Sequence, residues 1–166
     1  MNESMMDRVP PHNNEAEQSV IGAIFLEPQA LITASEILMP DDFYRTAHQK
    51  IFQTMLNLSD RGEAIDVVTV TEELSAKKEL EDVGGLTYLM ELAGAVPTAA
   101  NIAHYAKIVE EKALLRRLIR VATKIVEDGY TREDEVDALL VEAEKKMLEV
   151  ANRKNAGDFK HVKDVL

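Results

Sequence analysis

Apolar residues recur at helical rather than strand spacing through the first hundred residues of the chain. The first run follows Asn14, which precedes Glu17 by three positions in a capping-box pattern that predicts the start of a helix. Pro and Gly residues divide the later runs into short segments. Residues 10–98 therefore predict a small globular bundle of helices, and residues 1–9, which show no periodicity, predict a flexible arm.

One segment has the β-branched composition of a strand: residues 64–70, with the sequence AIDVVTV. A single strand has no partner with which to form a sheet, so we interpret the segment as a loop leading into a helix that carries Val70 and Leu74. The expected fold class is therefore all-α.

The second part of the chain predicts a long antiparallel helical hairpin over residues 99–151. No helix-breaking residue occurs between Ala99 and Gly129, which predicts one helix of roughly 30 residues, about 45 Å long. Residues 131–151 form a second amphipathic segment that would return alongside the first. Residues 152–166 are polar and regain apolar spacing only near their end, so they predict a linker and the start of a further helix.

The predicted hairpin carries more apolar surface than one helix contact covers. On a helical wheel, the apolar residues of 114–126 span an arc of about 160°, whereas a helix facing a single neighbour needs about 100°. This excess predicts pairing with a second copy or docking on another protein, unless the globular bundle folds back over the hairpin. The candidate self-association residues are Leu115, Leu118, Ala122, Val126, Val141 and Leu148.

The net charge of −11 is unevenly distributed. Residues 1–104 hold 17 acidic and 6 basic residues, whereas residues 105–166 hold 13 of each. The acidic first part repels phosphate groups, so proteins rather than nucleic acids are its expected partners. Within the hairpin, residues 107–128 are richer in basic residues and residues 131–151 in acidic ones, which favours antiparallel crossing of two hairpins.

The residues that usually carry chemistry are sparse. The chain has no cysteine, which fits a reducing cytoplasm, and its four histidines lack the spacing of zinc ligands. We expect His48 and His104 at the edge of the core or on the surface. No glycine-rich phosphate-binding motif, membrane-spanning run or signal-peptide pattern occurs in the sequence. We therefore expect no catalytic residue, metal ligand or cofactor site, and no membrane partner.

Four basic residues lie at four-residue intervals on the first hairpin arm: Lys112, Arg116, Arg120 and Lys124. They are candidates for weak phosphate contact, and the alternative function is that of a small helical single-stranded nucleic-acid-binding protein. An ordinary solvated helix face explains the same pattern. Because no aromatic residues interleave with these cations, only weak, sequence-independent contact is expected.

Several sequence blocks follow one another at defined intervals: RVPPHNNEAEQSVIGAIFLEPQAL, DDFYRTAHQKIFQTMLNL, IDVVTVTEEL and VGGLTYLMELAGAVPTAANIAHYAKIVEEKALLRRLI. Over residues 8–151 they closely resemble the N-terminal part of the bacterial replicative DNA helicases of the DnaB family. The resemblance implies a globular helical domain, a hairpin, and a linker to a RecA-like ATPase domain, which is absent from this chain. ATP and magnesium would bind to that domain, and this part would be non-catalytic.

The same resemblance implies partners. In the family the hairpins pair, three pairs form the collar of a hexameric ring, and single-stranded DNA passes through the ring. The helicase-binding domain of primase docks on the collar, and in some lineages the helicase loader also touches it. By position, Tyr88, Ile119 and Ile125 correspond to places where coupling to primase is sensitive. For both isoleucines a role in the hairpin core is the alternative.

Overall fold

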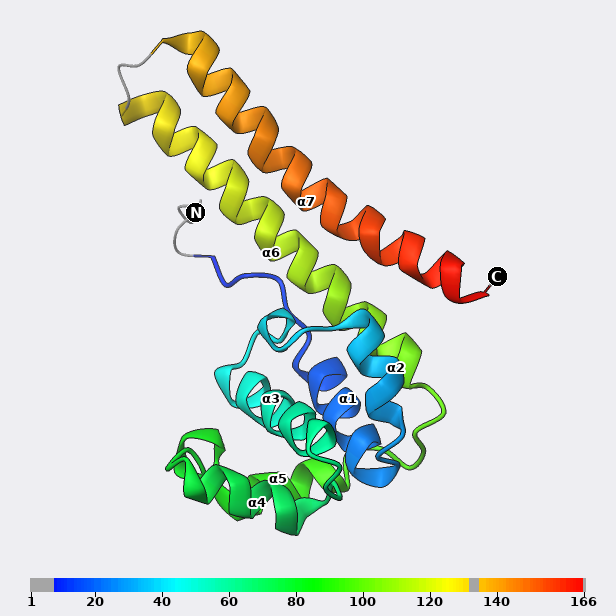
Figure 1. The fold of residues 1–166 in the computed structure, drawn as a ribbon. Coiled ribbons are helices and arrows are strands. Elements are labelled where there is room, and N and C mark those ends of the chain that lie inside the picture. The colour runs from blue at the N-terminus through cyan, green and yellow to red at the C-terminus, as the bar shows by residue number, and fades with distance from the viewer. Residues whose placement is uncertain (1–7, 132–134, 166) are drawn as a thin grey trace. The chain divides into compact units, whose positions relative to one another are not determined.

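The computed structural model of the chain describes residues 8–131 and 135–165, with side chains through Arg153. Every regular element in these ranges is a helix, which confirms the all-α fold class (Figure 1). The chain divides into two compact units. The globular unit contains His12–Ala113, and the hairpin unit contains Leu114–Leu166 together with Met1–Pro11.

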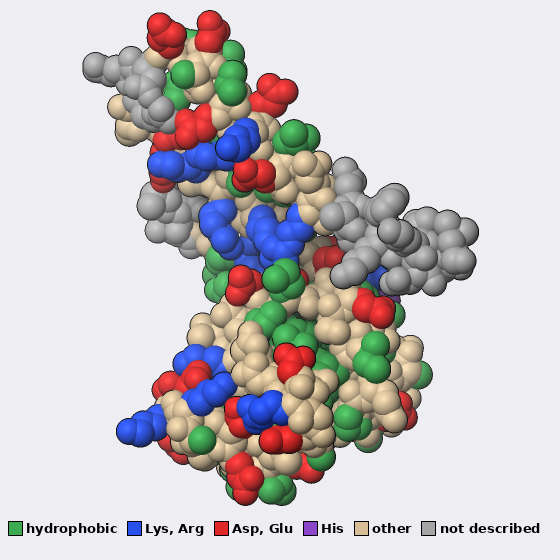
Figure 2. Space-filling view, in the orientation of Figure 1, with side chains coloured by type: hydrophobic (Ala, Val, Ile, Leu, Met, Phe, Trp, Pro, Cys, Tyr) green, Lys and Arg blue, Asp and Glu red, His purple; other side chains and the backbone are tan. Residues whose placement is uncertain are grey.

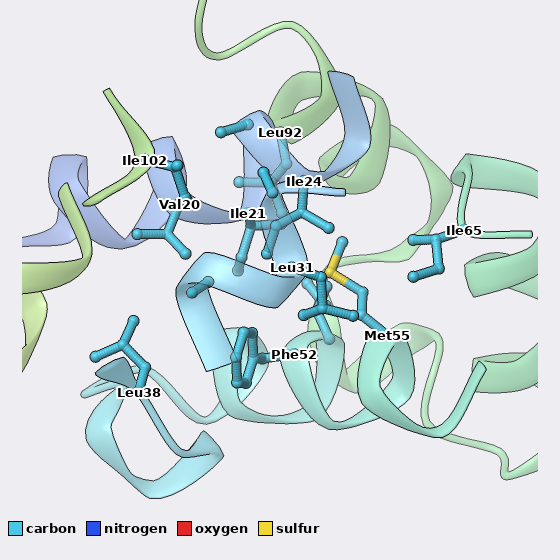
Figure 3. Close-up of a cluster of buried hydrophobic side chains, with 14 of the residues drawn as sticks. Val20, Ile21, Ile24, Leu31, Leu38, Phe52, Met55, Ile65, Leu92 and Ile102 are labelled. Carbon is cyan, nitrogen blue, oxygen red and sulfur yellow. The ribbon is translucent and has the colours of Figure 1, made fainter. Parts of the chain in front are cut away.

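The globular unit is built around helix α1 (Asn14–Leu26), which packs against three other helices, α2, α3 and α5. The remaining elements of the unit are α2 (Ala30–Ile37), η2 (Pro40–Asp42), α3 (Thr46–Asp60), α4 (Val67–Ala76), η3 (Glu81–Val83) and α5 (Gly85–Ala93). Figure 3 shows how Ile21 and Ile24 of α1 meet Phe52 and Met55 of α3 and Leu92 of α5 in the core. Burial of these large apolar side chains is the main stabilising term of the unit.

The start of α1 differs from the predicted capping box. The N-cap residue is Asn13 rather than Asn14, and its side-chain oxygen accepts a hydrogen bond from the backbone N–H of Ala16 at 2.9 Å. Glu17 takes no part in this cap, because its side chain is buried in the interior of the unit. The capping-box interpretation was therefore wrong, although the helix itself begins where the pattern placed it.

The strand-like segment 64–70 is a loop followed by a helix, as expected. Helix α4 begins at Val67, and its N-cap is Asp66, whose carboxylate accepts from the backbone N–H of Thr69 at 2.8 Å. The hydroxyl of Thr69 accepts in turn from the N–H of Asp66 at 3.0 Å. This reciprocal cap satisfies two backbone donors and outweighs the β propensity of the valines.

The globular unit extends further along the chain than the predicted boundary at residue 98. Helix α6 (Ile102–Thr131) begins inside this unit, where Ile102, Ala106 and Val109 are buried in the core. The division between the two units falls at Ala113, within the helix. The physical reason is that the first turns of α6 complete the core of the bundle before the helix continues into the hairpin.

The helices of the hairpin unit are the rest of α6 and its return partner α7 (Val136–Val165) (Figure 1). A single long helix is confirmed, but its bounds differ from the prediction. It begins at Ile102 rather than at about Ala99, and it continues to Thr131 through Gly129, where the pattern placed its end. Helix α7 also continues without a break to Val165, so the segment expected to be a linker from residue 152 is helical up to that residue. The expected arm over residues 1–9 lies outside the described residues except at Arg8 and Val9, which are exposed.

Candidate functional site

The interior of the globular unit holds a chain of hydrogen-bonded polar side chains from three helices. His48 of α3 is fully buried, and its Nδ1 atom lies 2.7 Å from Oε1 of Glu17 on α1, which is 1% exposed. Its Nε2 atom lies 2.7 Å from the hydroxyl oxygen of Tyr88 on α5. Gln18 and Arg45 approach the same hydroxyl at 3.2 and 3.4 Å. These five residues are called the polar network below.

The position of Glu17 explains why a carboxylate is tolerated in the core. Its oxygens accept from the backbone N–H groups of Tyr44 at 2.8 Å and Arg45 at 3.3 Å, directly before the first residue of α3. Donors at a helix N-terminus have no partner within the helix, and the helix dipole favours negative charge there. Glu17 therefore compensates its own burial by capping α3.

One arrangement of donors and acceptors fits the contacts of His48. With the Glu17 carboxylate as acceptor, the ring donates from Nδ1 to Glu17, and Nε2 accepts from the Tyr88 hydroxyl. The hydroxyl oxygen of Tyr88 is left as the acceptor for Gln18 and Arg45. The buried carboxylate oxygens of Glu17 and both ring nitrogens of His48 have a partner in this arrangement, as buried polar groups require.

Tyr88 also faces outward, onto an open pocket with a volume of about 380 Å³. Acidic residues dominate its charged rim, and Arg45 is its only basic lining residue; its guanidinium lies 5.6 Å from the centre of the Tyr88 ring. The Asp82 carboxylate accepts from Lys50 at 3.3 Å, and this hydrogen bond raises the pKa of Lys50 above its ordinary value. The pocket is lined by Arg45, Ala47, Glu81, Asp82, Val83, Gly84, Thr87, Tyr88 and Glu91.

Within the described part of the chain, no three His, Cys, Asp or Glu side chains are grouped so as to hold a metal ion. In the same residues no helix is both long and apolar enough to cross a membrane. His48 lies inside the core rather than at its edge, whereas His104 is exposed, as expected.

Sequence reasoning missed the polar network, although a signal for it exists. Glu17 precedes Val20, Ile21 and Ile24 by three, four and seven residues, so it lies on the buried face of α1. His48 has the same relation to Ile51, Phe52 and Met55 on α3. Two polar residues on apolar stripes of neighbouring helices are the pattern from which an internal pair could have been inferred.

The hairpin unit differs from the globular unit in lacking a closed core. Among described residues 114–131 and 135–153, no apolar side chain is buried; Arg116 and Asp128 are the buried residues. Figure 2 shows hydrophobic side chains at the surface of this unit. All six candidate self-association residues are exposed: Leu115, Leu118, Ala122, Val126, Val141 and Leu148. Their role in pairing stays a prediction.

The three candidate partner residues have different surroundings. Tyr88 belongs to the globular unit, as described above, whereas Ile119 and Ile125 belong to the hairpin unit. Ile119 is 50% exposed. Ile125 is half-buried and lines an apolar pocket of about 330 Å³ between the two arms, with Val136 and Leu139 of α7. Ile119 is thus open to a partner, and Ile125 contributes to packing between the arms.

We predict that alanine substitutions separate these two isoleucines. Ile125→Ala should lower the free energy of unfolding by about 1 kcal/mol, because it enlarges an existing gap between half-buried side chains. Ile119→Ala should change it by less than about 0.5 kcal/mol, as is usual at exposed positions. Urea unfolding monitored by circular dichroism measures both values, and equal losses would contradict this assignment.

The four basic residues do not form a continuous exposed row. Arg116 is buried, and its guanidinium donates to the backbone carbonyl oxygen of Pro11 at 2.8 Å. Lys124 pairs with Asp128 at 3.2 Å, and Lys112 is half-buried. The Arg116 side chain thus holds the backbone of Pro11. Phosphate contact by Lys112, Arg116, Arg120 and Lys124 stays a prediction.

Comparison with known proteins gives a family match that covers more than half of the chain. Residues 9–111 match the family described as DnaB-like helicase N terminal domain. The whole chain is 62% identical to the replicative DNA helicase DnaB of Geobacillus stearothermophilus and 63% identical to the replicative DNA helicase DnaC of Bacillus subtilis (strain 168). It spans 37% of the length of each of these relatives.

Solved structures agree with these sequence matches. The crystal structure of the N-terminal domain of DnaB helicase from Mycobacterium tuberculosis superimposes with a TM-score of 0.81 at 44% identity, covering 86% of this chain and 99% of that one. A DnaB-like replicative helicase, described with its interactions with primase, superimposes with a TM-score of 0.69 at 28% identity. That match covers 83% of this chain and 31% of the other.

Proposed function

The chain belongs to the family of DnaB-like helicase N-terminal domains, and we propose from this that it is the non-catalytic collar of a hexameric replicative DNA helicase. In this proposal its hairpins pair, three pairs form the ring, and the outer surface recruits primase during DNA replication. The observation that carries the proposal is the hairpin unit, whose described apolar side chains are all at least partly open to solvent.

Pairing of hairpins follows from the energetics of that unit. Two isolated helices that leave their apolar residues exposed gain little from packing on each other, because the hydrophobic contribution scales with the area removed from water. Val141 and Leu148 lie one heptad apart on α7 and are both more than half exposed. A second hairpin laid along this ridge would bury them, as the interior of an obligate interface does.

Primase is the proposed partner of the outer surface. A relative with the same fold is described with its interactions with primase, which supports the same role here. Tyr88 on the pocket of the globular unit and Ile119 on the hairpin are the proposed contacts, since both are accessible. Ile125 would affect primase binding indirectly, through the packing of the two hairpin arms.

The other parts of the proposed helicase and its further partners are not in this chain. The parent helicase would bind ATP and magnesium in a RecA-like domain and would act in the cytoplasm. Single-stranded DNA would pass through the ring with weak direct contact to the collar, and a helicase loader would be a further partner of the same collar. The acidic charge of residues 1–104 agrees with a protein-binding rather than a DNA-binding role.

Two measurements on the chain test this proposal. Sedimentation velocity should show self-association that increases with concentration, and isothermal titration should show binding of the helicase-binding domain of primase. Monomeric behaviour at high micromolar concentration would contradict the collar assignment. Tight binding of single-stranded DNA with a steep salt dependence, and none of primase, would instead support a nucleic-acid-binding protein.

A further inference from the structure

The Tyr88 hydroxyl is hydrogen-bonded to the interior of the globular unit, through residues that a partner protein cannot reach. His48 is fully buried, and Glu17 is 1% exposed, yet together they connect the Tyr88 hydroxyl to the N-terminus of α3. The front of the Tyr88 ring forms part of the wall of the open pocket. The side chain thus joins the interior of the globular unit to a surface that a partner can reach.

Glu17 also contacts the backbone of Arg45, another residue that lines the pocket. The backbone N–H of Arg45 donates to Glu17, and the Arg45 guanidinium lies over the Tyr88 ring and near its hydroxyl. A left-handed turn at Gly84 also brings the backbone close to Tyr88, so that a Cβ at Gly84 would lie 2.8 Å from the Cβ of Tyr88. Arg45 and the backbone at Gly84 therefore both pack closely on Tyr88.

Stability alone gives a weak reason for such a network. Replacing a buried polar cluster by apolar residues of similar volume is often neutral or stabilising, whereas hydrogen bonds specify one side-chain conformation. In the polar network the Tyr88 hydroxyl is hydrogen-bonded to His48 and Arg45, and these bonds favour the conformation that Tyr88 has here. The polar network therefore influences the shape of the pocket that Tyr88 lines.

We propose that Glu17 and His48 are positioning residues for the partner surface at Tyr88, which they fix from inside the globular unit. This inference rests on the proposed function, in which Tyr88 contacts primase. The hydrogen bonds of the polar network connect the N-terminus of α3 to the Tyr88 hydroxyl through Glu17 and His48. Neither positioning residue touches the partner, so each acts only through the conformation of Tyr88.

The test compares single and double variants of the 166-residue chain in titrations with the helicase-binding domain of primase. Tyr88→Phe and His48→Gln should each weaken binding about three- to tenfold, the size expected for one hydrogen bond. The double variant should bind no more weakly than the weaker single variant, because both changes release the same side chain. Tyr105→Phe, at another half-buried tyrosine, is the matched control and should leave the affinity unchanged.

A spectroscopic signature separates positioning from a general loss of stability. With ¹³C-labelled tyrosine, the chain gives signals from only four residues. His48→Gln should shift the Tyr88 signal and leave that of Tyr130 in place, and primase should shift the Tyr88 signal of the wild type. A protein that is only destabilised would show a lower melting temperature and an unchanged affinity of its folded form.

The outcomes distinguish the two proposals. If the wild-type chain does not bind primase, the proposed function fails, and the positioning role for that surface fails with it. If the wild type binds and Tyr88→Phe or His48→Gln binds equally well, only the positioning role is overturned. Additive losses in the double variant would also overturn it, since they would mean that His48 acts independently of Tyr88.

Discussion

Replacing Gly22 by valine is expected to lower the free energy of unfolding of the globular unit by about 3 kcal/mol or more. Gly22 lies in α1 where that helix meets the end of α5. A Cβ at this position would lie 2.6 Å from the carbonyl oxygen of Leu92 and 3.0 Å from the Cβ of Ala95. The nearest atom belongs to the backbone, so relief requires the two helices to separate.

Two opposing contributions to the free energy of unfolding decide whether a side chain at Gly22 stabilises or destabilises the unit. A side chain in place of a helical glycine contributes at most about 1 kcal/mol through backbone entropy, whereas overpacking a tight contact costs about 1–3 kcal/mol for a few atoms. Even Gly22→Ala should therefore be destabilising, and valine adds two further methyl groups. Chemical denaturation measures both changes.

Gly129 provides the matched control. It also lies in a helix, α6, but an added Cβ there would meet no atom within 4 Å. Gly129→Ala should therefore be neutral or stabilise the chain by up to about 1 kcal/mol. Equal effects at the two glycines would show that close packing of α1 on α5 is not what requires Gly22.

Introducing glutamate at both Val141 and Leu148 is expected to weaken self-association of the chain at least about 100-fold. The two residues form the ridge on α7 that we propose a second hairpin covers. An unpaired carboxylate in such an interface has to be desolvated, and this costs several kcal/mol per group unless it finds a partner. Sedimentation equilibrium of the double variant gives the association constant directly.

Val68→Glu is the control for this experiment. Val68 lies on α4 and is 67% exposed, compared with 68% for Val141, so both changes place the same charge on a helical valine of the same accessibility. Only the ridge variant should lose association. If it associates like the wild type, Val141 and Leu148 are not in the interface, and pairing must use the exposed residues of α6 instead.

The hairpin was predictable because its information is local. The apolar spacing from Ile102 to Val126 is uninterrupted. The end of α6 was misplaced, because one glycine near the end of a long helix is too small a penalty to stop it. Val141 and Leu148, both exposed, lie seven residues apart and therefore on one side of α7. Both conclusions require only the order of residues along a single helix.

The same local reasoning could not find where the core ends. The periodicity of α6 runs through Ala113 unchanged, so nothing in the sequence marks the point at which its neighbours change. Arg116 was misplaced for a related reason. A wheel assigns charged residues to solvent, whereas here a backbone carbonyl from Pro11, more than a hundred residues earlier in the chain, covers the guanidinium.

The polar network was still harder to predict from the sequence. Glu17, His48 and Tyr88 are separated by 31 and 40 residues along the chain, and their contacts depend on how three helices pack. Spacing placed Glu17 in a cap because a capping box is a local motif, and the structure uses its carboxylate to cap a different helix, α3. Tertiary packing decided its role.

The open packing of the hairpin unit has a consequence for the lifetime of an unassembled copy. Backbone segments with few buried apolar contacts open at a lower free-energy cost than a closed core, and proteases cleave what opens. A subunit outside the proposed ring would thus be cleaved first along the hairpin arms, while its globular unit persists. Pairing removes that weakness by mass action, so excess copies would be cleared in preference to those already in a ring.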